Sequence, residues 1–252
     1  MRGRRFTRRR LLVGSGAGGL GIAVVSTIAG CSSSSPRSGS GSTDGAASGG
    51  PSFSTATDFG DWHRVDLSFV SAYLLIRGGQ AAVVDLGTPG SGGSIEAGLQ
   101  AAGVGWNAVR HVILTHQHSD HVGAASEVAP KVTAGSLYSG AADVTGINSP
   151  TPVKPLNDGD EIFGLRIIGT PGHTSGHISV FDPSVGVLVA GDALRTNATG
   201  LAGPDPQYTD DEAQAAASVR KLATLDIKTI LPGHGNPMTA GAAEALKKLA
   251  GS

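Results

Sequence analysis

Cysteine is almost absent from this sequence: Cys31 stands alone among 252 residues, so no internal disulfide can form. Aromatic residues are also few, at 4% of the chain, whereas glycine is abundant, with 39 residues. Abundant glycine indicates many tight turns or a flexible segment. No segment repeats at the periods typical of solenoid proteins, and one globular domain is the default at this length.

Basic residues are scarce beyond the N-terminus. Residues 1–30 contain six arginines and no acidic residue, and the rest of the chain has 13 basic and 20 acidic residues, a net charge of −7. Proteins that bind nucleic acid carry a basic surface that neutralises phosphates. The charge therefore argues against nucleic acid as a partner and favours a small-molecule substrate.

The first 30 residues have the layout of a secretory signal peptide. Arginines at residues 2–10 precede an apolar, glycine-rich stretch that ends at residue 28. Residues 7–12 resemble the twin-arginine export motif, and residues 28–31 resemble the lipobox of bacterial lipoproteins. We expect Cys31 to be lipidated and the protein to be anchored on the outer face of the cytoplasmic membrane, which makes the membrane a partner through this lipid.

Two other interpretations of this region are weaker. Free cysteines are usually buried, but Cys31 is followed by four serines, which do not form a core. A transmembrane anchor needs at least about 18 apolar residues, and glycine dilutes this stretch. Residues 31–57 have few large apolar side chains, so they are predicted to form a flexible tether before a catalytic domain at residues 58–252.

Hydrophobic patterns in residues 58–252 predict strands and helices in alternation. Gly78 and Gly79 separate two strand-like runs, which indicates a hairpin. Thr209 and Glu212 fit a capping box that would begin a helix. The expected strands cover residues 69–77, 80–86, 109–115, 161–170, 178–182, 185–190 and 228–231; the expected helices cover residues 95–102, 122–129, 138–143, 209–225 and 242–249. This order suggests two packed sheets with helices outside them, although periodicity does not fix the topology.

Four candidate metal ligands directly follow the apolar strand at residues 109–115: His116, His118, Asp120 and His121. Functional sites are often built where a strand ends, and an aspartate is seldom buried without a partner. A solvated polar turn, or an accidental cluster of histidines, is the alternative interpretation. Further candidates downstream in similar contexts favour a built metal site.

These further candidates are His173, Asp192 and His234. Each follows a strand-like run and is bracketed by glycine, which lets the backbone turn sharply. Imidazole and carboxylate groups suit zinc and, less selectively, iron or manganese. Seven such ligands are too many for one tetrahedral ion, but they suit two ions that share a bridging ligand.

The segments that carry these residues resemble, in order, the motifs of the metallo-β-lactamase superfamily over residues 62–240. The resemblance implies an α+β fold, the four-layer αββα sandwich, with two metal ions at one edge. It implies that His116, His118 and His173 hold the first ion. It further implies that Asp120, His121 and His234 hold the second ion and that Asp192 bridges the two.

The same resemblance implies the chemistry. A hydroxide between the two ions, most simply Zn²⁺, would be the nucleophile, and Asp120 would pass a proton to the leaving group. No protein nucleophile is then needed, in agreement with the absence of a Gly-x-Ser-x-Gly motif from the sequence.

The remaining polar residues carry weaker signals. Asp85 is expected either to orient a metal-ligating histidine or to bond the backbone. His177 is expected to pack beside the site rather than to ligate, and His63 and His111 are taken as ordinary residues. Arg195 is either a contact for an anionic substrate or a surface arginine, and the second interpretation is favoured because the similar homoserine-lactone lactonases have a tyrosine there.

A dinuclear metallo-hydrolase of a small ester, thioester or lactone is the predicted function. Zinc β-lactamases generally lack the bridging aspartate, and glyoxalase II enzymes add a helical domain that the residues after His234 do not supply. Three alternatives stay open: a β-lactam hydrolase, a persulfide dioxygenase with a single iron, and a non-catalytic lipoprotein that binds a ligand. Two zinc-like ions per chain would indicate a hydrolase, whereas one iron would indicate the dioxygenase. A loss of hydrolysis when Asp120 is replaced by alanine would separate a hydrolase from the non-catalytic lipoprotein.

Overall fold

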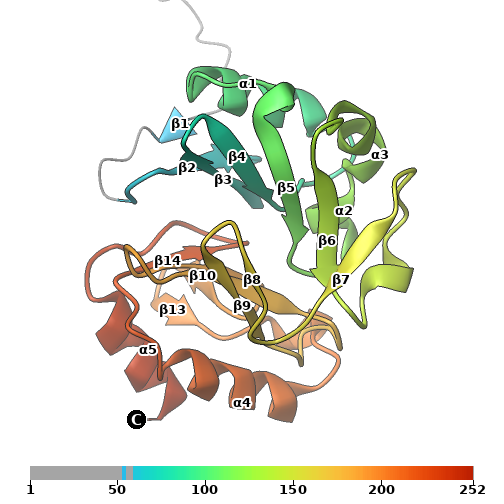
Figure 1. Cartoon of the computed structure of the whole chain (residues 1–252). Helices are drawn as coiled ribbons and strands as arrows, with labels where there is room; N and C mark the ends of the chain where they lie inside the picture. Colours follow the sequence, from blue (N-terminus) through green and yellow to red (C-terminus); the bar gives the residue numbers. More distant parts are fainter. Residues whose placement is uncertain (1–52, 55–58, 252) are drawn as a thin grey trace, which may run out of the picture. The chain divides into compact units, whose positions relative to one another are not determined.

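The computed structural model of the chain describes residues 53–54 and 59–251. Within these residues a seven-stranded sheet packs against a five-stranded sheet, and helices cover the outer face of each (Figure 1). This is the αββα sandwich that the sequence predicted. None of the helices in the described part of the chain has the length and apolar character needed to cross a bilayer.

The predicted signal peptide, the lipobox with Cys31 and most of the predicted tether lie outside the described residues. Residues 53–54 are an exception. They form a short strand that pairs with the strand at Trp62–Asp66, so the sheet begins before residue 58, where the domain was expected to start.

The seven-stranded sheet follows the order of the chain. Its strands are β1 (Phe53–Ser54), β2 (Trp62–Asp66), β3 (Ser71–Arg77), β4 (Gln80–Val84), β5 (Val109–Leu114), β6 (Ser136–Gly140) and β7 (Val153–Leu156). Strands β1 to β4 are antiparallel, whereas β4, β5, β6 and β7 run parallel. Parallel strands end at the same edge, so the segments that follow β4, β5 and β6 lie close together.

The five-stranded sheet has the order β14-β11-β10-β9-β8. Its strands are β8 (Glu161–Ile162), β9 (Leu165–Gly169), β10 (Ile178–Asp182), β11 (Val187–Gly191) and β14 (Thr229–Pro232). Only the β11–β14 pair is parallel. A separate two-stranded sheet joins β12 (Arg195–Asn197) to β13 (Gly200–Ala202).

Three apolar layers hold the sandwich together. The central layer lies between the sheets and includes Trp62, Ile167 and Val180, all without exposed surface. On the outer face of the larger sheet pack α1 (Gly92–Ala101), α2 (Ser119–Val122) and α3 (Ala125–Val128). On the outer face of the smaller sheet pack α4 (Glu212–Leu222) and α5 (Ala242–Ala250). Because both faces of each sheet are covered, central strands such as β11 are buried throughout.

Several expected elements occur where the sequence predicted them. The hairpin at Gly78 and Gly79 joins β3 to β4, and both glycines have positive φ angles, as a tight hairpin turn requires. The strand expected at residues 178–182 is β10, and the helix expected at residues 242–249 is α5.

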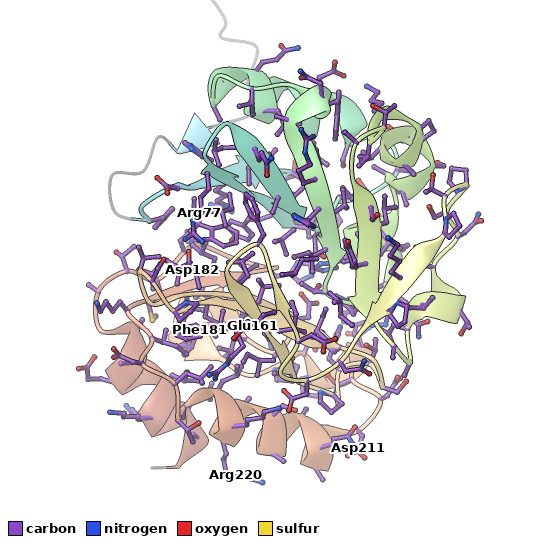
Figure 2. The ribbon with its side chains drawn as sticks, viewed as in Figure 1. Arg77, Glu161, Phe181, Asp182, Asp211 and Arg220 are labelled. Carbon is purple, nitrogen blue, oxygen red and sulfur yellow. The ribbon has the colours of Figure 1, made fainter. Side chains whose placement is uncertain are left out.

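Four local predictions were wrong. The helix expected at residues 138–143 is strand β6, because Leu137 is buried in the core while the backbone pairs with β5. The strand expected at residues 161–170 is a hairpin that turns at Phe163 and Gly164. The helix expected at residues 122–129 is interrupted after Val122, so that two short helices form. The N-cap of α4 is Asp211, labelled in Figure 2, and not Thr209. The side chain of Asp211 accepts the N–H of Gln214.

A buried carboxylate joins the two sheets at the end of β10 that is remote from His177. Asp182 is fully buried and accepts a hydrogen bond from the indole N–H of Trp62 at 3.0 Å. It also pairs with Arg77 of β3, and Figure 2 shows both residues where the sheets meet. Such a satisfied ionic contact ties β10 to the opposite sheet.

Candidate metal centre

The histidine-rich segment leaves the end of β5 and enters α2. Its backbone is extended at His118, which occupies the N-cap position of α2, and the single turn that follows carries Asp120 and His121. His116 and His121 are fully buried, whereas Asp120 is partly exposed. The tight turn therefore directs four candidate ligands to one edge of the sandwich.

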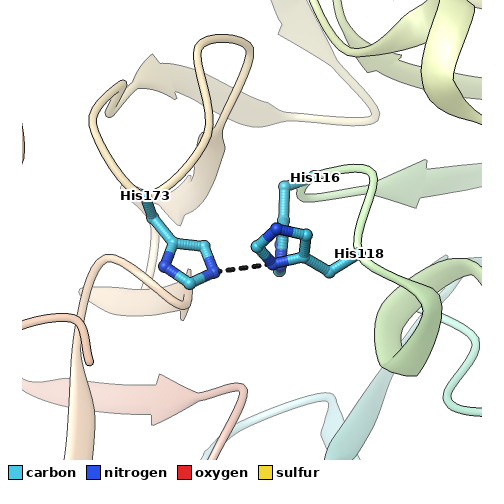
Figure 3. A group of neighbouring side chains, drawn as sticks. All are labelled: His116, His118 and His173. Carbon is cyan, nitrogen blue, oxygen red and sulfur yellow. Dashed lines mark hydrogen bonds between the residues drawn. The ribbon is translucent and has the colours of Figure 1, made fainter. Parts of the chain in front are cut away.

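Three imidazoles meet across the two sheets. His116 and His118 come from the loop after β5, and His173 comes from the loop after β9 (Figure 3). One nitrogen from each lies within 4.8 Å of the others. Nε2 of His173 is 3.0 Å from Nδ1 of His118. These are the three residues that the resemblance assigned to the first ion.

A second group lies beside the first. Ligand atoms of Asp120, His121 and His234 also lie within 4.8 Å of one another. Oδ2 of Asp120 is 3.3 Å from Nε2 of His234, which comes from the loop after β14. These are the residues that the resemblance assigned to the second ion.

Asp192 lies between the two groups. Its Oδ1 atom is 3.2 Å from Nε2 of His121, and its Oδ2 atom is 3.2 Å from Nε2 of His234. Oδ2 is also 3.4 Å from Nε2 of His173, a member of the first group. The structure thus brings all seven predicted ligands together, with the aspartate in contact with both sets.

The outer nitrogens of four histidines are engaged by the protein. Each Nδ1 atom lies within hydrogen-bond distance of an oxygen atom. His116 contacts the Thr115 hydroxyl, His121 contacts the Asp85 carboxylate, His173 contacts the Thr209 hydroxyl, and His234 contacts the Phe69 carbonyl. These contacts orient the rings and leave the Nε2 atoms to face the cluster.

Asp85 lies directly behind the site. It follows β4, has a φ angle of 61° and is 2% exposed. Its carboxylate accepts hydrogen bonds from the backbone and hydroxyl of Thr115 at 2.7 and 2.8 Å. It also contacts Nδ1 of His121 at 2.8 Å. Asp85 therefore makes both contacts that the sequence left as alternatives, one with a histidine and one with the backbone.

His177 is buried beside the cluster, and both of its nitrogens are occupied. Nε2 accepts the backbone N–H of Asp192 at 3.0 Å, and Nδ1 contacts the Thr170 hydroxyl at 2.8 Å. Burial lowers the pKa of His177 to about 3. This neutral ring supports the backbone that presents Asp192. His63 and His111 belong to none of the three ligand groups.

Burial lowers the pKa of some histidines of the site, whereas neighbouring carboxylates raise the pKa of others. Burial lowers the pKa of His116 well below its ordinary value and that of His173 to about 4, so both rings stay neutral, as ligands must be. Burial has the same effect on His234, but hydrogen bonds to Asp120 and Asp192 outweigh it and raise the pKa to about 10. The carboxylates thus attract positive charge to the place where a cation would bind.

One family model matches residues 65–234, and its description is "Metallo-beta-lactamase superfamily". The chain belongs to the metallo-β-lactamase superfamily. It is 33% identical over 201 residues to the "Probable metallo-hydrolase YflN" of Bacillus subtilis, across 62% of this chain and 76% of that protein.

Two other similar proteins bear on the site. The chain is 30% identical over 177 residues to a "Hydroxyacylglutathione hydrolase" of Dechloromonas aromatica, across 66% of this chain but only 60% of that protein. It is 28% identical to TTHA1623, which was crystallised in a di-iron-bound form. That comparison has a TM-score of 0.57 and covers 70% of this chain and 92% of TTHA1623.

The residues present fit the metal ions that the superfamily implies. In the described part of the chain, Nε2 of His116 is a buried polar atom without a hydrogen-bond partner. Such an atom is costly unless another group satisfies it, and a bound cation would do so. Imidazole and carboxylate donors suit zinc and iron alike.

A cavity of about 630 Å³ opens above the site. Its lining residues are Phe69, Thr88, His118, Ser119, Asp120, His173, Asp192, Arg195, Asp205, Tyr208 and His234. Arg195 is the only lysine or arginine among them. Its guanidinium donates to the Gly203 carbonyl at 3.1 Å and lies 3.4 Å from a carboxylate oxygen of Asp205. Arg195 is therefore part of the cavity wall, and its contact with substrate stays a prediction.

The sequence missed two residues that support the site. Thr209, which was expected to cap α4, instead contacts Nδ1 of His173 at 3.3 Å and donates to the Asp205 carbonyl at 2.7 Å. Asp143 is fully buried and contacts both loops that carry the first three histidines. Neither lies in a motif of ligands, so no signal in the sequence marks them.

Gly233 is expected to be needed for tight metal binding in this member of the superfamily. A Cβ atom at Gly233 would lie 2.3 Å from Oδ1 of Asp192 and 2.7 Å from His121, so Gly233→Ala must displace one of them. A displacement of this kind can cost about 10²-fold in function, and we expect zinc affinity to fall by about tenfold to a hundredfold.

Zinc titration against a competing chelator measures the effect. Gly93→Ala is the matched control, because a Cβ atom there meets nothing within 4 Å and Gly93 lies in α1. Equal zinc affinity in the Gly233→Ala variant and the parent chain would contradict the close packing described for Gly233.

Proposed function

We propose that this chain is a metal-dependent hydrolase of a small ester, thioester or lactone. One observation carries the proposal: seven imidazole and carboxylate side chains converge beneath an open cavity, and Asp192 contacts both groups of histidines. Membership of the superfamily and the resemblance to two proteins named as hydrolases support it.

The residues divide into two sets. His116, His118 and His173 would hold one divalent ion, and Asp120, His121 and His234 would hold the other. Asp192 would contact both ions. Bound there, two such ions supply an activated water and polarise a substrate carbonyl.

Asp120 is the residue best placed to move a proton. It lines the cavity, and its side chain is 27% exposed, unlike the buried Asp192. Its neighbour His234 is held by a hydrogen bond with the Phe69 carbonyl at 2.8 Å, which restricts the ring. We propose that Asp120 accepts the proton of the attacking water and delivers it to the departing oxygen or sulfur atom.

The cavity favours a substrate with both apolar and anionic parts. Phe69 and Tyr208 are each 60% exposed and line it, so they offer apolar surface to a bound molecule. Arg195 adds a cationic group to the same wall. The hydroxyacylglutathione hydrolase of Dechloromonas aromatica is named for a thioester substrate, and this likeness supports thioesters as candidates beside esters and lactones.

Zinc is the proposed metal, with iron as the alternative. The donor set accepts both, and the di-iron form of TTHA1623 supports iron as a candidate. A persulfide dioxygenase with one iron is the other enzyme class that the sequence left open. Two ions per chain favour the hydrolase, whereas a single iron favours the dioxygenase.

The proposed location rests on the sequence alone. The arginines of residues 2–10 and the lipobox-like residues 28–31 support export and lipidation of Cys31. A lipid on Cys31 would hold the hydrolase on the outer face of the cytoplasmic membrane, where its substrate would be an extracytoplasmic small molecule rather than a nucleic acid.

Substitution of Asp120 tests the proposal. Asp120→Asn keeps the size of the side chain and removes its ability to accept a proton, so hydrolysis is expected to fall by about 10²-fold. The zinc-loaded variant and parent chain are assayed with thioesters, lactones, esters and β-lactams. Asp226→Asn, an exposed charge change outside the cavity, is the control.

Metal content is measured for each protein in the same samples, so that loss of an ion is separated from loss of proton transfer. If the zinc-loaded parent chain hydrolyses none of these substrates, or if Asp120→Asn hydrolyses them at the parent rate, the proposed function is wrong.

A further inference from the structure

One buried carboxylate lies where the loops of the metal centre meet. Asp143 follows β6 and has no exposed surface. Its backbone N–H donates to the carbonyl of Gly140, the last residue of β6, at 3.0 Å. The residue is thereby fixed to the seven-stranded sheet.

The carboxylate of Asp143 accepts three hydrogen bonds from two loops. Oδ2 accepts the backbone N–H of Gln117 at 3.0 Å and the hydroxyl of Thr174 at 2.6 Å. Oδ1 accepts the backbone N–H of Gly176 at 2.7 Å. Gln117 belongs to the loop after β5, whereas Thr174 and Gly176 belong to the loop after β9 in the other sheet.

The partners of Asp143 are the immediate neighbours of candidate ligands. Gln117 separates His116 from His118, and Thr174 directly follows His173. Of the three imidazoles in Figure 3, His116 and His118 follow a strand of the larger sheet, and His173 follows a strand of the smaller sheet. Asp143 bonds both of the segments that carry them. A shift of this carboxylate would change the distance between His173 and the other two rings.

We propose that Asp143 is a positioning residue that fixes the spacing of His116, His118 and His173 and so sets the affinity for the ion that they hold. This inference rests on the metal centre of the proposed function, and it assigns a role to a residue outside the ligand set. Asp143 touches neither the candidate ligands' nitrogens nor the cavity.

Packing makes the contact specific for a short carboxylate. A Cβ atom at Gly176 would lie 2.3 Å from the backbone nitrogen of Asp143 and 2.5 Å from its Oδ1 atom, so the loop rests directly on this residue. A carboxylate presents two acceptor oxygens to these three donors. Asparagine has the same size but only one acceptor oxygen, so it cannot satisfy all three donors in the same way.

Two substitutions test the role of Asp143. Asp143→Asn removes one acceptor, and Thr174→Val removes one donor while it leaves the carboxylate in place. In zinc titrations against a competing chelator, each is expected to raise one of the two zinc dissociation constants by about 10- to 100-fold. Thr174→Ser keeps the hydroxyl and is expected to restore the parent value.

Asp182→Asn is the matched control. Asp182 is equally buried and also joins the two sheets, through Trp62 and Arg77, but it lies at the end of β10 remote from His177. This variant is expected to lower the melting temperature of the metal-free protein and to leave both zinc dissociation constants unchanged. If Asp143 had a merely structural role, Asp143→Asn would also lower the melting temperature of the metal-free protein and leave both zinc dissociation constants unchanged.

The outcomes separate this inference from the proposed function. If the parent chain binds two zinc ions and Asp143→Asn and Thr174→Val bind them as tightly, the positioning role is overturned and the proposed function stands. A parent chain that binds no zinc and no iron overturns both.

Discussion

Replacement of Asp192 by alanine is expected to lower hydrolysis by about 10³- to 10⁴-fold, because the variant loses the one carboxylate among the described residues that contacts both histidine groups. Asp192 is buried, and its pKa is held well below the ordinary value because its interactions with His121 and His234 outweigh the effect of burial. Asp192 is thus ionised and available to a cation.

The Asp192→Ala substitution should leave the surrounding backbone in place. The N–H of residue 192 donates to His177, and this contact does not depend on the aspartate side chain. The expected loss therefore reflects the metal centre rather than collapse of the loop.

Metal content and hydrolysis are measured together for Asp192→Ala. Two ions per chain are expected in the parent and fewer in the variant, and Asp226→Ala is the control for loss of an exposed carboxylate. Parent-like activity with a parent-like metal content in Asp192→Ala would show that the aspartate is not part of the centre.

Removal of the metal ions is expected to lower the melting temperature by about 15–30 °C. A ligand at about 1,000 times its dissociation constant stabilises a fold by about 4 kcal/mol, and two sites would double this. For a domain of this size, each kcal/mol changes the melting temperature by about 2–4 °C.

The physical reason for this large shift lies in the metal-free cluster. Without ions, Nε2 of His116 stays buried without a partner, and the negative charge of the neighbouring carboxylates is compensated by protons on His121 and His234. Scanning calorimetry of the chelator-treated and zinc-reloaded protein measures the shift. In the Asp192→Ala variant the chelator should have a much smaller effect, and an equal melting temperature with and without metal in the parent chain would contradict the account.

The convergence of the seven candidate ligands was predictable because its signal is local. His116, His118, Asp120 and His121 occupy one short turn, and His173, Asp192 and His234 each follow a strand beside glycine. The chemistry of zinc and iron restricts which side chains occur in such a pattern. The structure places these seven residues together, as the motifs predicted.

The supporting residues were less predictable because their partners are distant along the chain. Asp143 bonds Gln117 and Thr174, and nothing in its own neighbourhood indicates either contact. The prediction of a helix at residues 138–143 failed for a related reason: pairing of β6 with β5 and β7 outweighs the local pattern.

Thr209 illustrates a conflict between two local signals. Its spacing from Glu212 satisfies the capping-box pattern, yet Asp211 caps α4 and Thr209 contacts His173 instead. Serine, threonine and aspartate all cap helices well, so neighbouring candidates compete, and tertiary contacts decide between them. Arg195 is a similar case, because only the folded chain shows that it lines the cavity.

Anomalous X-ray diffraction from crystals of the zinc-loaded protein tests the central claim most directly. We predict two zinc peaks per chain, one about 2.0–2.1 Å from nitrogens of His116, His118 and His173, and a second at similar distances from Asp120, His121 and His234, with Asp192 in contact with both. No peak within the cluster, or a single peak with either group of three left unbound, would contradict it.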